Sequence, residues 1–231
     1  FKALYKRRLD GEPVQYITGS AAFMLGEFEV GPAVLIPRPE TEALTEVALR
    51  LLEAVPDAPV VADIGTGSGV IAVTIAMKVP AATVYATDVS QAALEVAARN
   101  AERAGVADRV TFLEGEMLHP LRGNGLAGDV TALISNPPYI PTGDLAGLPT
   151  EVREFEPREA LDGGEDGLEC LRVLVHDGPE LLSLGGFLAL EVGDGQAPVI
   201  AGMLEEMLGN AEVHKDYAGR ERIVTGVRGV E

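Results

Sequence analysis

The sequence has one cysteine, no tryptophan and three histidines among its 231 residues. The single thiol, Cys170, can form no internal disulfide, and apolar neighbours at helical spacing predict that it packs in the core. The histidines lie far apart and have no partners at the spacing of metal ligands, so we expect no metal site. These absences argue against a disulfide scaffold and against a zinc module.

Long apolar runs are also missing. None approaches the roughly 20 residues that a membrane-spanning helix needs, and the first ten residues, FKALYKRRLD, lack the apolar stretch of a signal peptide. We therefore expect a cytoplasmic protein with no membrane partner.

Basic residues are scarce, since 18 Lys and Arg stand against 36 Asp and Glu, for a formal net charge of −18. Proteins that grip phosphates usually present a basic face. The charge balance therefore argues against direct binding of nucleic acid.

What the sequence does contain is an alternation of short apolar runs with amphipathic segments. Two runs at 14–18 and 28–30, with Gly19 and Gly26 between them, predict a β-hairpin. Helical periodicity follows at 40–55, 68–78, 91–104, 165–183 and 196–208. Buried strands are expected at VVADIG, TVYATDV, 110–114, DVTALIS and GFLALEV, and a final strand pair at AEVHKDY and RIVTGVR. Strands alternating with helices predict an α/β fold with a doubly wound, mostly parallel seven-stranded sheet.

A glycine-rich turn, DIGTGSG, occupies residues 63–69 after the first of these strands. Its glycines let backbone N–H groups approach a ligand, and the following helix adds a positive dipole. The G-x-G-x-x-G spacing of dinucleotide enzymes is not met, because Val70 follows Gly69. Asp88 ends the next strand, where a carboxylate can accept hydrogen bonds from ribose hydroxyls. A simple helix-capping role in a tight turn is the alternative for Asp88.

A second signal is ISNPPYI, at residues 134–140, which sets two prolines after an asparagine. The structural reading is strand termination, because proline donates no N–H. The chemical reading is a cradle in which the Asn136 side-chain carbonyl and the Pro137 backbone carbonyl each accept one N–H of a planar NH2 group. Tyr139 could then lie against that flat group, or it could be an ordinary half-buried aromatic. We favour the cradle.

DIGTGSG, Asp88 and NPPY, in this order, resemble class I S-adenosylmethionine-dependent methyltransferases that alkylate a planar amino or amide nitrogen. Longer segments narrow the resemblance to the HemK-type peptide chain release factor glutamine methyltransferases, over most of the chain from about Gly11. These segments are GEPVQYITGSAAFMLGEFEVGPAVLIPRPETE, LPTEVREFEPREALDGGEDGL and LEVGDGQ.

The resemblance implies a Rossmann-like methyltransferase domain over residues 37–231. Residues 1–36 would be a linker that contains the hairpin and the remnant of an N-terminal helical domain largely absent from this chain. The implied reaction moves a methyl group from S-adenosyl-L-methionine to the side-chain amide of the glutamine in the Gly-Gly-Gln loop of class I peptide chain release factors. S-adenosyl-L-homocysteine is the implied product.

Position and resemblance together predict the site residues. Those expected to bind the cofactor are Asp63, Gly65, Thr66, Gly67, Ser68, Gly69, Asp88, Val89, Glu116, Met117 and Asn136. Those expected to act in catalysis are Asn136, Pro137 and Tyr139. Those expected to bind the substrate are Arg38, Glu40, Asn136, Pro137, Pro138 and Tyr139.

Individual roles are expected within this set. Asp63 could accept from the methionine ammonium group, Glu116 from the adenine amino group, and Met117 could cover the adenine ring. Glu116 and Met117 depart from the family, which commonly has Asp followed by a bulky residue there. Arg38 and Glu40 either line the substrate cleft or simply begin a helix. The long, Pro- and Gly-rich stretch 140–165 is expected to form a wall of that cleft.

Two other functions stay open at this point. NPPY also occurs in adenine and guanine methyltransferases of nucleic acid, although the charge and the flanking segments oppose that function. The glycine turn alone would serve a non-catalytic nucleotide-binding module, but such a module has no need of NPPY. We assign no general base, because an alkylated, positively charged nitrogen loses its proton readily.

Overall fold

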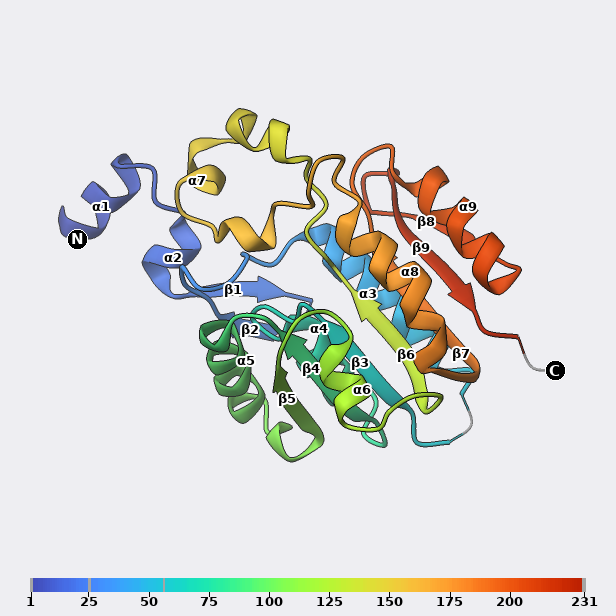
Figure 1. Cartoon of the computed structure of the whole chain (residues 1–231). Helices are drawn as coiled ribbons and strands as arrows, with labels where there is room; N and C mark the ends of the chain where they lie inside the picture. Colours follow the sequence, from blue (N-terminus) through green and yellow to red (C-terminus); the bar gives the residue numbers. More distant parts are fainter. Residues whose placement is uncertain (1, 25, 56, 230–231) are drawn as a thin grey trace.

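The computed structural model describes residues 2–24, 26–55 and 57–229 (Figure 1). The chain begins with two short helices, α1 (Lys2–Leu9) and α2 (Val14–Thr18). A two-stranded antiparallel sheet follows, formed by β1 (Ser20–Phe23) and β2 (Gly26–Glu29). These elements lie beside one end of the main sheet in Figure 1.

The main sheet has the strand order β5-β4-β3-β6-β7-β9-β8. Its strands are β3 (Val60–Ile64), β4 (Thr83–Asp88), β5 (Val110–Glu114), β6 (Val130–Ser135), β7 (Leu182–Glu191), β8 (Glu212–Lys215) and β9 (Glu221–Val227). The strands from β3 to β7 pair in parallel, whereas β9 is antiparallel to β7 and to β8. The expected doubly wound, mostly parallel seven-stranded sheet is therefore confirmed.

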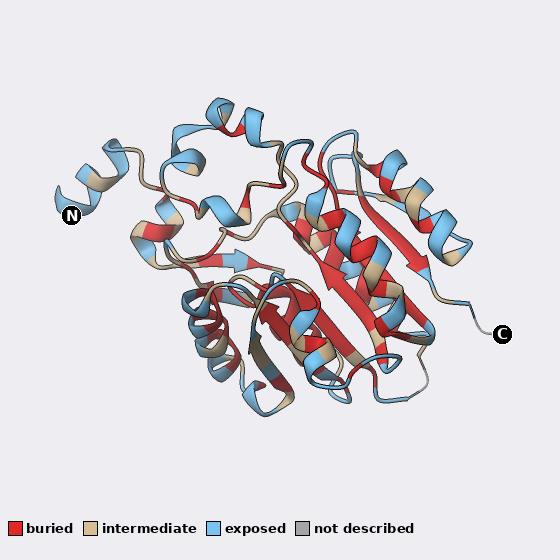
Figure 2. Ribbon diagram, in the orientation of Figure 1, coloured by how far each residue is buried: buried red, intermediate tan, exposed pale blue. Residues whose placement is uncertain are grey.

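Helices cover both faces of the sheet (Figure 1). One hydrophobic cluster joins the sheet to α3 (Pro39–Leu52), α4 (Val70–Lys78) and α5 (Gln91–Arg103). A second cluster joins the other face to α6 (His119–Gly123), α8 (Glu169–Leu181) and α9 (Ala197–Leu208). Parallel strands covered on both faces need apolar side chains on both faces, and Figure 2 shows the central strands buried over most of their length. The continuous apolar runs of the sequence have this origin.

Helix α3 illustrates how local sequence sets an element. Pro39 occupies its first turn, where a missing N–H costs nothing, and Glu40 and Glu42 suit the positive end of the helix dipole. Leu44 and Ala48, on one face of the helix, are fully buried against the sheet. This packing fixes the first turn of α3 beside the carboxyl ends of the central strands.

The predicted hairpin was wrong in its first strand. Residues 14–18 form helix α2, and the hairpin pairs β1 with β2 instead. Gly19 ends the helix in the left-handed region (φ 78°) and donates its N–H to the Gln15 carbonyl. Tyr16 is buried, and its hydroxyl donates to the Val34 carbonyl at 2.6 Å. Burial of Tyr16 thus decides a segment whose β-branched composition favours a strand.

Several boundaries also differ from expectation. The helix expected at 165–183 is α8, which begins only at Glu169, after the glycines of residues 163–167, and ends at Leu181. The helix expected from residue 68 begins at Val70, because Gly69 is in the left-handed region. The long stretch 140–165, for which no helix was expected, contains the short helices η2 (Thr142–Gly147), α7 (Thr150–Arg153) and η3 (Arg158–Ala160).

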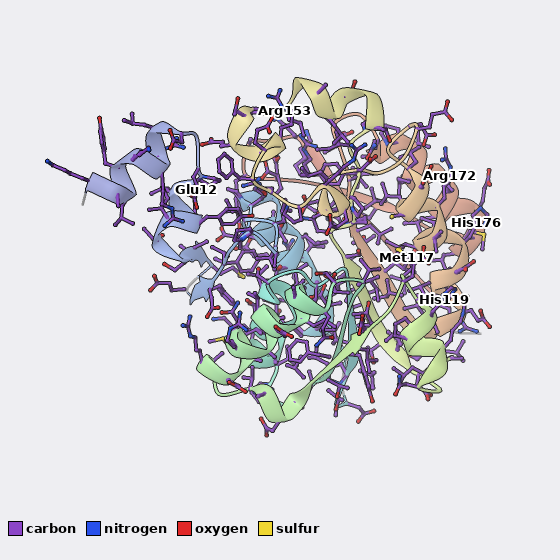
Figure 3. The ribbon with its side chains drawn as sticks, turned by 60° about the vertical axis from the view of Figure 1, so that its left-hand side comes forward. Glu12, Met117, His119, Arg153, Arg172 and His176 are labelled. Atoms are coloured by element: carbon purple, nitrogen blue, oxygen red, sulfur yellow. The ribbon has the colours of Figure 1, made fainter. Side chains whose placement is uncertain are left out.

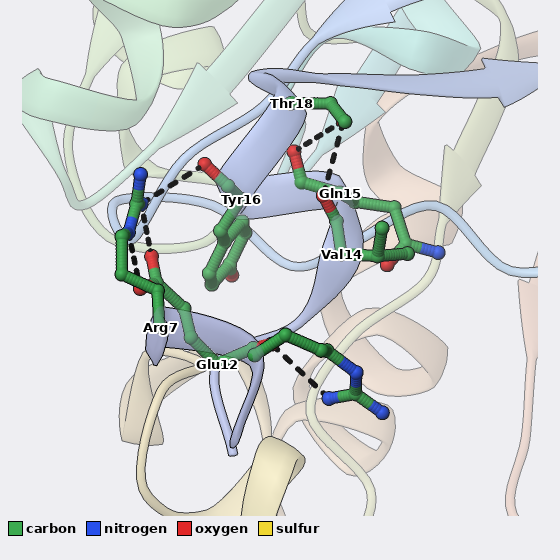
Figure 4. A network of polar contacts seen from close by, with 7 residues as sticks. Arg7, Glu12, Val14, Gln15, Tyr16 and Thr18 are labelled. Atoms are coloured by element: carbon green, nitrogen blue, oxygen red, sulfur yellow. Dashed lines mark hydrogen bonds and ion pairs between the residues drawn. The ribbon is translucent and has the colours of Figure 1, made fainter. Parts of the chain in front are cut away.

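Polar contacts tie the N-terminal helices together. Arg7 donates from Nε to the Glu12 carboxylate at 2.6 Å and from its guanidinium to the Tyr16 carbonyl (Figure 4). Arg8 reaches Glu151 of α7 at 2.9 Å. The Arg8–Glu151 pair is exposed, so it contributes little to the free energy of unfolding. Among the described residues, no helix is long and apolar enough to cross a membrane.

Candidate active site

The carboxyl ends of β3, β4, β5 and β6 meet at one edge of the sheet, and a cavity opens there. This is the edge at which open α/β sheets bind ligands. The predicted site residues that line the cavity are Gly65, Thr66, Gly67, Ser68, Asp88, Val89, Glu116, Met117, Asn136 and Pro138. The predicted site residues outside its lining are Arg38, Glu40, Asp63, Gly69, Pro137 and Tyr139.

The glycine turn bends against β4 and faces the cavity. The N–H groups of Gly65 and Thr66 both donate to the Thr87 carbonyl at 2.9 Å. Gly65 (φ 71°) and Gly67 (φ 54°) are in the left-handed region, and a side chain added at either would meet no protein atom within 4 Å. The turn therefore presents bare backbone to open space, as a ligand-binding loop requires.

Asp88 holds the glycine turn in place. Its Oδ2 accepts from the Gly67 N–H at 2.9 Å, and its Oδ1 accepts from the Ser90 N–H at 2.9 Å. Burial raises the pKa of the Asp88 carboxyl, while these two bonds lower it. Ser90, and not Asp88, caps helix α5, because its Oγ accepts from the Ala93 N–H. The alternative for Asp88 is therefore wrong about helix capping, but Asp88 does close a tight turn through the Ser90 N–H.

Asp63 lies beneath the turn rather than on the cavity wall. It is fully buried, and its Oδ2 accepts from Thr66 Oγ1 at 2.6 Å and from the Ala72 N–H at 3.1 Å. Its Oδ1 has no partner among the described residues. Burial raises the pKa of Asp63 to about 7, against the effect of both hydrogen bonds. In this structure Asp63 braces the turn, and its contact with a ligand stays a prediction.

The loop after β5 also lines the cavity. Met117, labelled in Figure 3, has a positive φ of 49°, which is uncommon for a residue with a side chain. Its carbonyl accepts a weak hydrogen bond from Thr87 Oγ1 at 3.4 Å. Glu116 and Met117 both line the cavity. Their contacts with an adenine ring stay predictions.

Asn136 and Pro138 line the cavity beside the glycine turn, because they follow β6, which pairs with β3. Asn136 Nδ2 donates to Thr41 Oγ1 at 2.9 Å. Neither Asn136 Oδ1 nor the Pro137 carbonyl accepts a hydrogen bond from any residue that the structure describes. Asn136 Oδ1 is thus left for an incoming group, as the cradle reading expects. Pro137 is buried and does not line the cavity, so the role of its carbonyl stays a prediction.

Tyr139 does not line the cavity. Its hydroxyl donates to Glu191 Oε1 at 3.2 Å, and its ring packs in the second hydrophobic cluster. Burial, aided by the nearby Glu191 charge, raises the pKa of this hydroxyl above its usual range. Stacking of the ring on a substrate amide stays a prediction.

The sequence predictions missed the hydrogen-bonded pair Glu191 and Thr41. Glu191, at the end of β7, is fully buried, and its Oε2 accepts from Thr41 Oγ1 at 2.8 Å. Burial raises the pKa of Glu191 to about 7, although the bonds from Thr41 and Tyr139 lower it. A signal for Glu191 was present, because it interrupts the apolar run GFLALEV of a buried strand. An acid in that position needs partners.

Arg38 and Glu156 connect the start of α3 to the stretch 140–165. Arg38 forms an ion pair with Glu156, whose buried carboxylate also accepts from the Ile36 N–H at 3.3 Å. From the same stretch, Pro157, Glu159 and Ala160 line the cavity. The ion pair thus holds a wall of the cavity in place, and Arg38 itself does not reach the lining.

The prediction that Cys170 packs in the core is wrong. Cys170 is half-buried and lines the cavity. Burial raises the pKa of its thiol. Further lining residues that the motifs did not indicate are Ala33, Val34, Leu35, Pro37, Thr41, Ile64, Val70, Ile71, Thr87, Ser90, Ala93 and Gly115. Within the described part of the chain, no group of acidic, histidine or cysteine residues is placed to hold a metal ion.

Comparison with known proteins decides the family. A model of the methyltransferase small domain matches residues 41–146. The release factor glutamine methyltransferase of Moorella thermoacetica is 49% identical over 96% of this chain and 77% of its own. That of Gloeobacter violaceus is 46% identical over the same shares. The chain belongs to the release factor glutamine methyltransferase family.

Solved structures agree with this assignment. The release factor-specific protein-(glutamine-N5) methyltransferase of Alicyclobacillus acidocaldarius shares 32% identity and a TM-score of 0.54, covering 88% of this chain and all of that one. A methyltransferase from Pyrococcus furiosus has a TM-score of 0.62 at 21% identity, covering both chains completely. The latter similarity shows the fold alone. As a member of this family, the chain is a methyltransferase with the Rossmann-like fold of class I.

Proposed function

We propose that this enzyme transfers a methyl group from S-adenosyl-L-methionine to the side-chain amide nitrogen of the glutamine in the Gly-Gly-Gln loop of class I peptide chain release factors. The observation that carries the proposal is the unused acceptor Asn136 Oδ1, on a residue that lines the cavity beside the glycine turn. Because release factors act in translation, we also propose that the enzyme works in the cytoplasm.

The residues present fit the cofactor. The bare backbone of Gly65 and Gly67 leaves room that a side chain would fill. Each Asp88 oxygen accepts one backbone N–H and retains a lone pair for ribose hydroxyls. Glu116 and Met117 would border the adenine, and Asp63 Oδ1 is the unpartnered buried oxygen behind the turn. When bound, S-adenosylmethionine supplies an electrophilic methyl group on a sulfonium ion.

An amide nitrogen is a poor nucleophile, because its lone pair is delocalised into the carbonyl. The enzyme must therefore hold the nitrogen in line with the methyl group and stabilise the charge that develops on it. Asn136 Oδ1 and the Pro137 carbonyl would each accept one of the two amide N–H bonds. Both acceptors carry partial negative charge, so they interact more strongly with a nitrogen that becomes positive. No residue is assigned as general base.

The proposal is tested by incubating the enzyme with labelled S-adenosylmethionine and one of three acceptors. These are a release factor, the same factor with its loop glutamine changed to alanine, and duplex DNA. Label is expected on the first acceptor only. Label on the DNA and none on the release factor would show a nucleic acid methyltransferase instead.

A further inference from the structure

A chain of hydrogen bonds joins Asn136 to Tyr139 through Thr41 and Glu191. Asn136 Nδ2 donates to Thr41 Oγ1 at 2.9 Å, and Thr41 Oγ1 donates to Glu191 Oε2 at 2.8 Å. The other carboxylate oxygen, Oε1, accepts from the Tyr139 hydroxyl at 3.2 Å. These side chains come from α3, from the loop after β6 and from the end of β7. Three distant parts of the sequence therefore meet behind the proposed cradle.

The single proton of the Thr41 hydroxyl fixes the direction of this chain. An ionised Glu191 can only accept, so the Thr41 proton must point toward Glu191. The Thr41 oxygen is then left to accept from Asn136, and only the NH2 group of the Asn136 amide can donate. The carbonyl oxygen of that amide must consequently face away from Thr41.

We propose that Glu191, acting through Thr41, sets the amide orientation of Asn136 so that Oδ1 is presented to the substrate nitrogen. Thr41 and Glu191 are in this view positioning residues for methyl transfer. The inference rests on the proposed function, since it assigns a reason for one orientation of the cradle. It also explains why a carboxyl group is kept fully buried at the end of β7.

Protonation of Glu191 would reverse the chain. A proton on Oε2 donates to Thr41, the Thr41 hydroxyl is then free to donate to the Asn136 carbonyl, and the Asn136 NH2 turns toward the cavity. An NH2 group cannot accept from the NH2 of a glutamine. Methyl transfer is therefore expected to slow when the proton is on Oε2.

The groups that face Glu191 set how readily it ionises. Thr41 and Tyr139 donate to it, and Glu40 on α3 and Arg222 on β9 act on it by charge. Burial and Glu40 raise the pKa of Glu191, whereas Arg222 and the two hydrogen bonds lower it, and the outcome is a value of about 7. The ionised fraction consequently changes around neutral pH.

Thr41→Val tests the link from Glu191 to Asn136, because it removes the hydroxyl at nearly constant volume. Thr45→Val is the matched control: Thr45 is also buried on α3, and its hydroxyl donates to the Thr41 backbone carbonyl at 2.8 Å. Single-turnover methylation of a release factor at saturating cofactor should slow by at least about tenfold in Thr41→Val. It should stay at the parental rate in Thr45→Val. Equal rates in the parental enzyme and Thr41→Val would overturn the proposal.

Glu191→Gln tests the charge. The parental single-turnover rate should rise with pH through about 7, as Glu191 ionises. Glu191→Gln keeps the shape but cannot ionise, so its rate should lack this rise. A Glu191→Gln enzyme with the parental rate and the parental pH profile would contradict the assignment.

A readout that needs no activity separates this inference from the proposed function. The side-chain NH2 signal of Asn136 in a nitrogen-15 NMR spectrum is identified by its loss in Asn136→Ala. It should shift with pH near 7 in the parental enzyme and in Thr45→Val, and it should exchange faster with solvent in Thr41→Val. If neither pH nor Thr41→Val changed the shift or the solvent exchange of the Asn136 signal, the inference would be wrong. Absence of methyl transfer by the parental enzyme would refute the proposed function and leave the NMR result to decide the orientation.

Discussion

The two sides of the cavity are held by different kinds of contact. On the glycine-turn side, Asp88 accepts from two backbone N–H groups. Ser90 is two residues away in sequence, and Gly67 lies on the neighbouring glycine turn. On the NPPY side, Asn136 depends on side chains 95 and 150 residues apart, through the Asn136–Thr41 and Thr41–Glu191 bonds. Hydrogen bonds from backbone N–H groups persist through most substitutions nearby. A series of hydrogen bonds between side chains is interrupted when any one of those side chains is replaced. The two sides should therefore respond differently to mutation.

The largest effect is expected from Asn136→Ala, which removes one of the two proposed acceptors. The methyl-transfer step should slow on the order of 100-fold or more, as when a preorganised polar group is deleted from other active sites. Cofactor affinity should change much less. Single-turnover methylation of a release factor at saturating cofactor measures the first quantity, and calorimetry the second. A parental rate in Asn136→Ala would mean that NPPY only ends a strand.

Asp88→Ala should have the next largest effect, and on the other side of the cavity. Hydrogen bonds to charged groups contribute roughly 1.5–3 kcal/mol, so the cofactor dissociation constant should rise about 10- to 100-fold. Part of this loss would come from the turn, because Gly67 and Ser90 lose their acceptor. Calorimetry with a circular dichroism control is the measurement. An unchanged dissociation constant in a folded protein would refute the assignment of Asp88.

Tyr139 should give a graded result. Tyr139→Phe loses the bond to Glu191 but keeps the packed ring, so it should slow methyl transfer by less than Tyr139→Ala. The two rates are compared in the same single-turnover assay. A Tyr139→Phe enzyme as slow as Tyr139→Ala would assign the whole effect to the hydroxyl.

The smallest effect concerns stability and pH. Burial raises the pKa values of Asp63 and Glu191 to about 7, from 3.8 and 4.5. A raised carboxyl pKa favours the folded state at pH values below the unfolded pKa, and that contribution is lost as pH rises through the folded pKa. The free energy of unfolding should therefore fall between about pH 4 and pH 7.

Glu191→Gln should reduce the slope of the free energy of unfolding against pH, by at most about 1.4 kcal/mol per pH unit for one proton. Denaturant titrations at pH 5, 6, 7 and 8 measure it. Glu102→Gln, on the exposed face of α5, is the control and should keep the parental slope. If Glu191→Gln and Glu102→Gln had the same slope, Glu191 would not titrate in this range.

Sequence reasoning predicted which residues meet at the cavity where the signal is local. The glycine turn, Asp88 and NPPY are short motifs at strand ends, and parallel strands bring their carboxyl ends to one edge. It failed at residues 14–18, where burial of Tyr16 overrides strand propensity. Propensity is a weak guide when a single tertiary contact decides the element.

Thr41 and Glu191 show a second limit. Each lies within a segment that the sequence analysis noticed, but nothing in the sequence pairs them, because they are 150 residues apart. Cys170 was misplaced for a related reason, since helical spacing indicates which face is apolar but not whether a cavity adjoins that face. Contacts across the fold require coordinates.

The central claim is that the Asn136 side of the cavity directs methylation to an amide nitrogen. Fragment mass spectrometry of a release factor, after incubation with the enzyme and S-adenosylmethionine, tests it most directly. The account predicts one added methyl group, located on the side-chain nitrogen of the glutamine in the Gly-Gly-Gln loop. A methyl group on any other residue, or none on this glutamine, would contradict it.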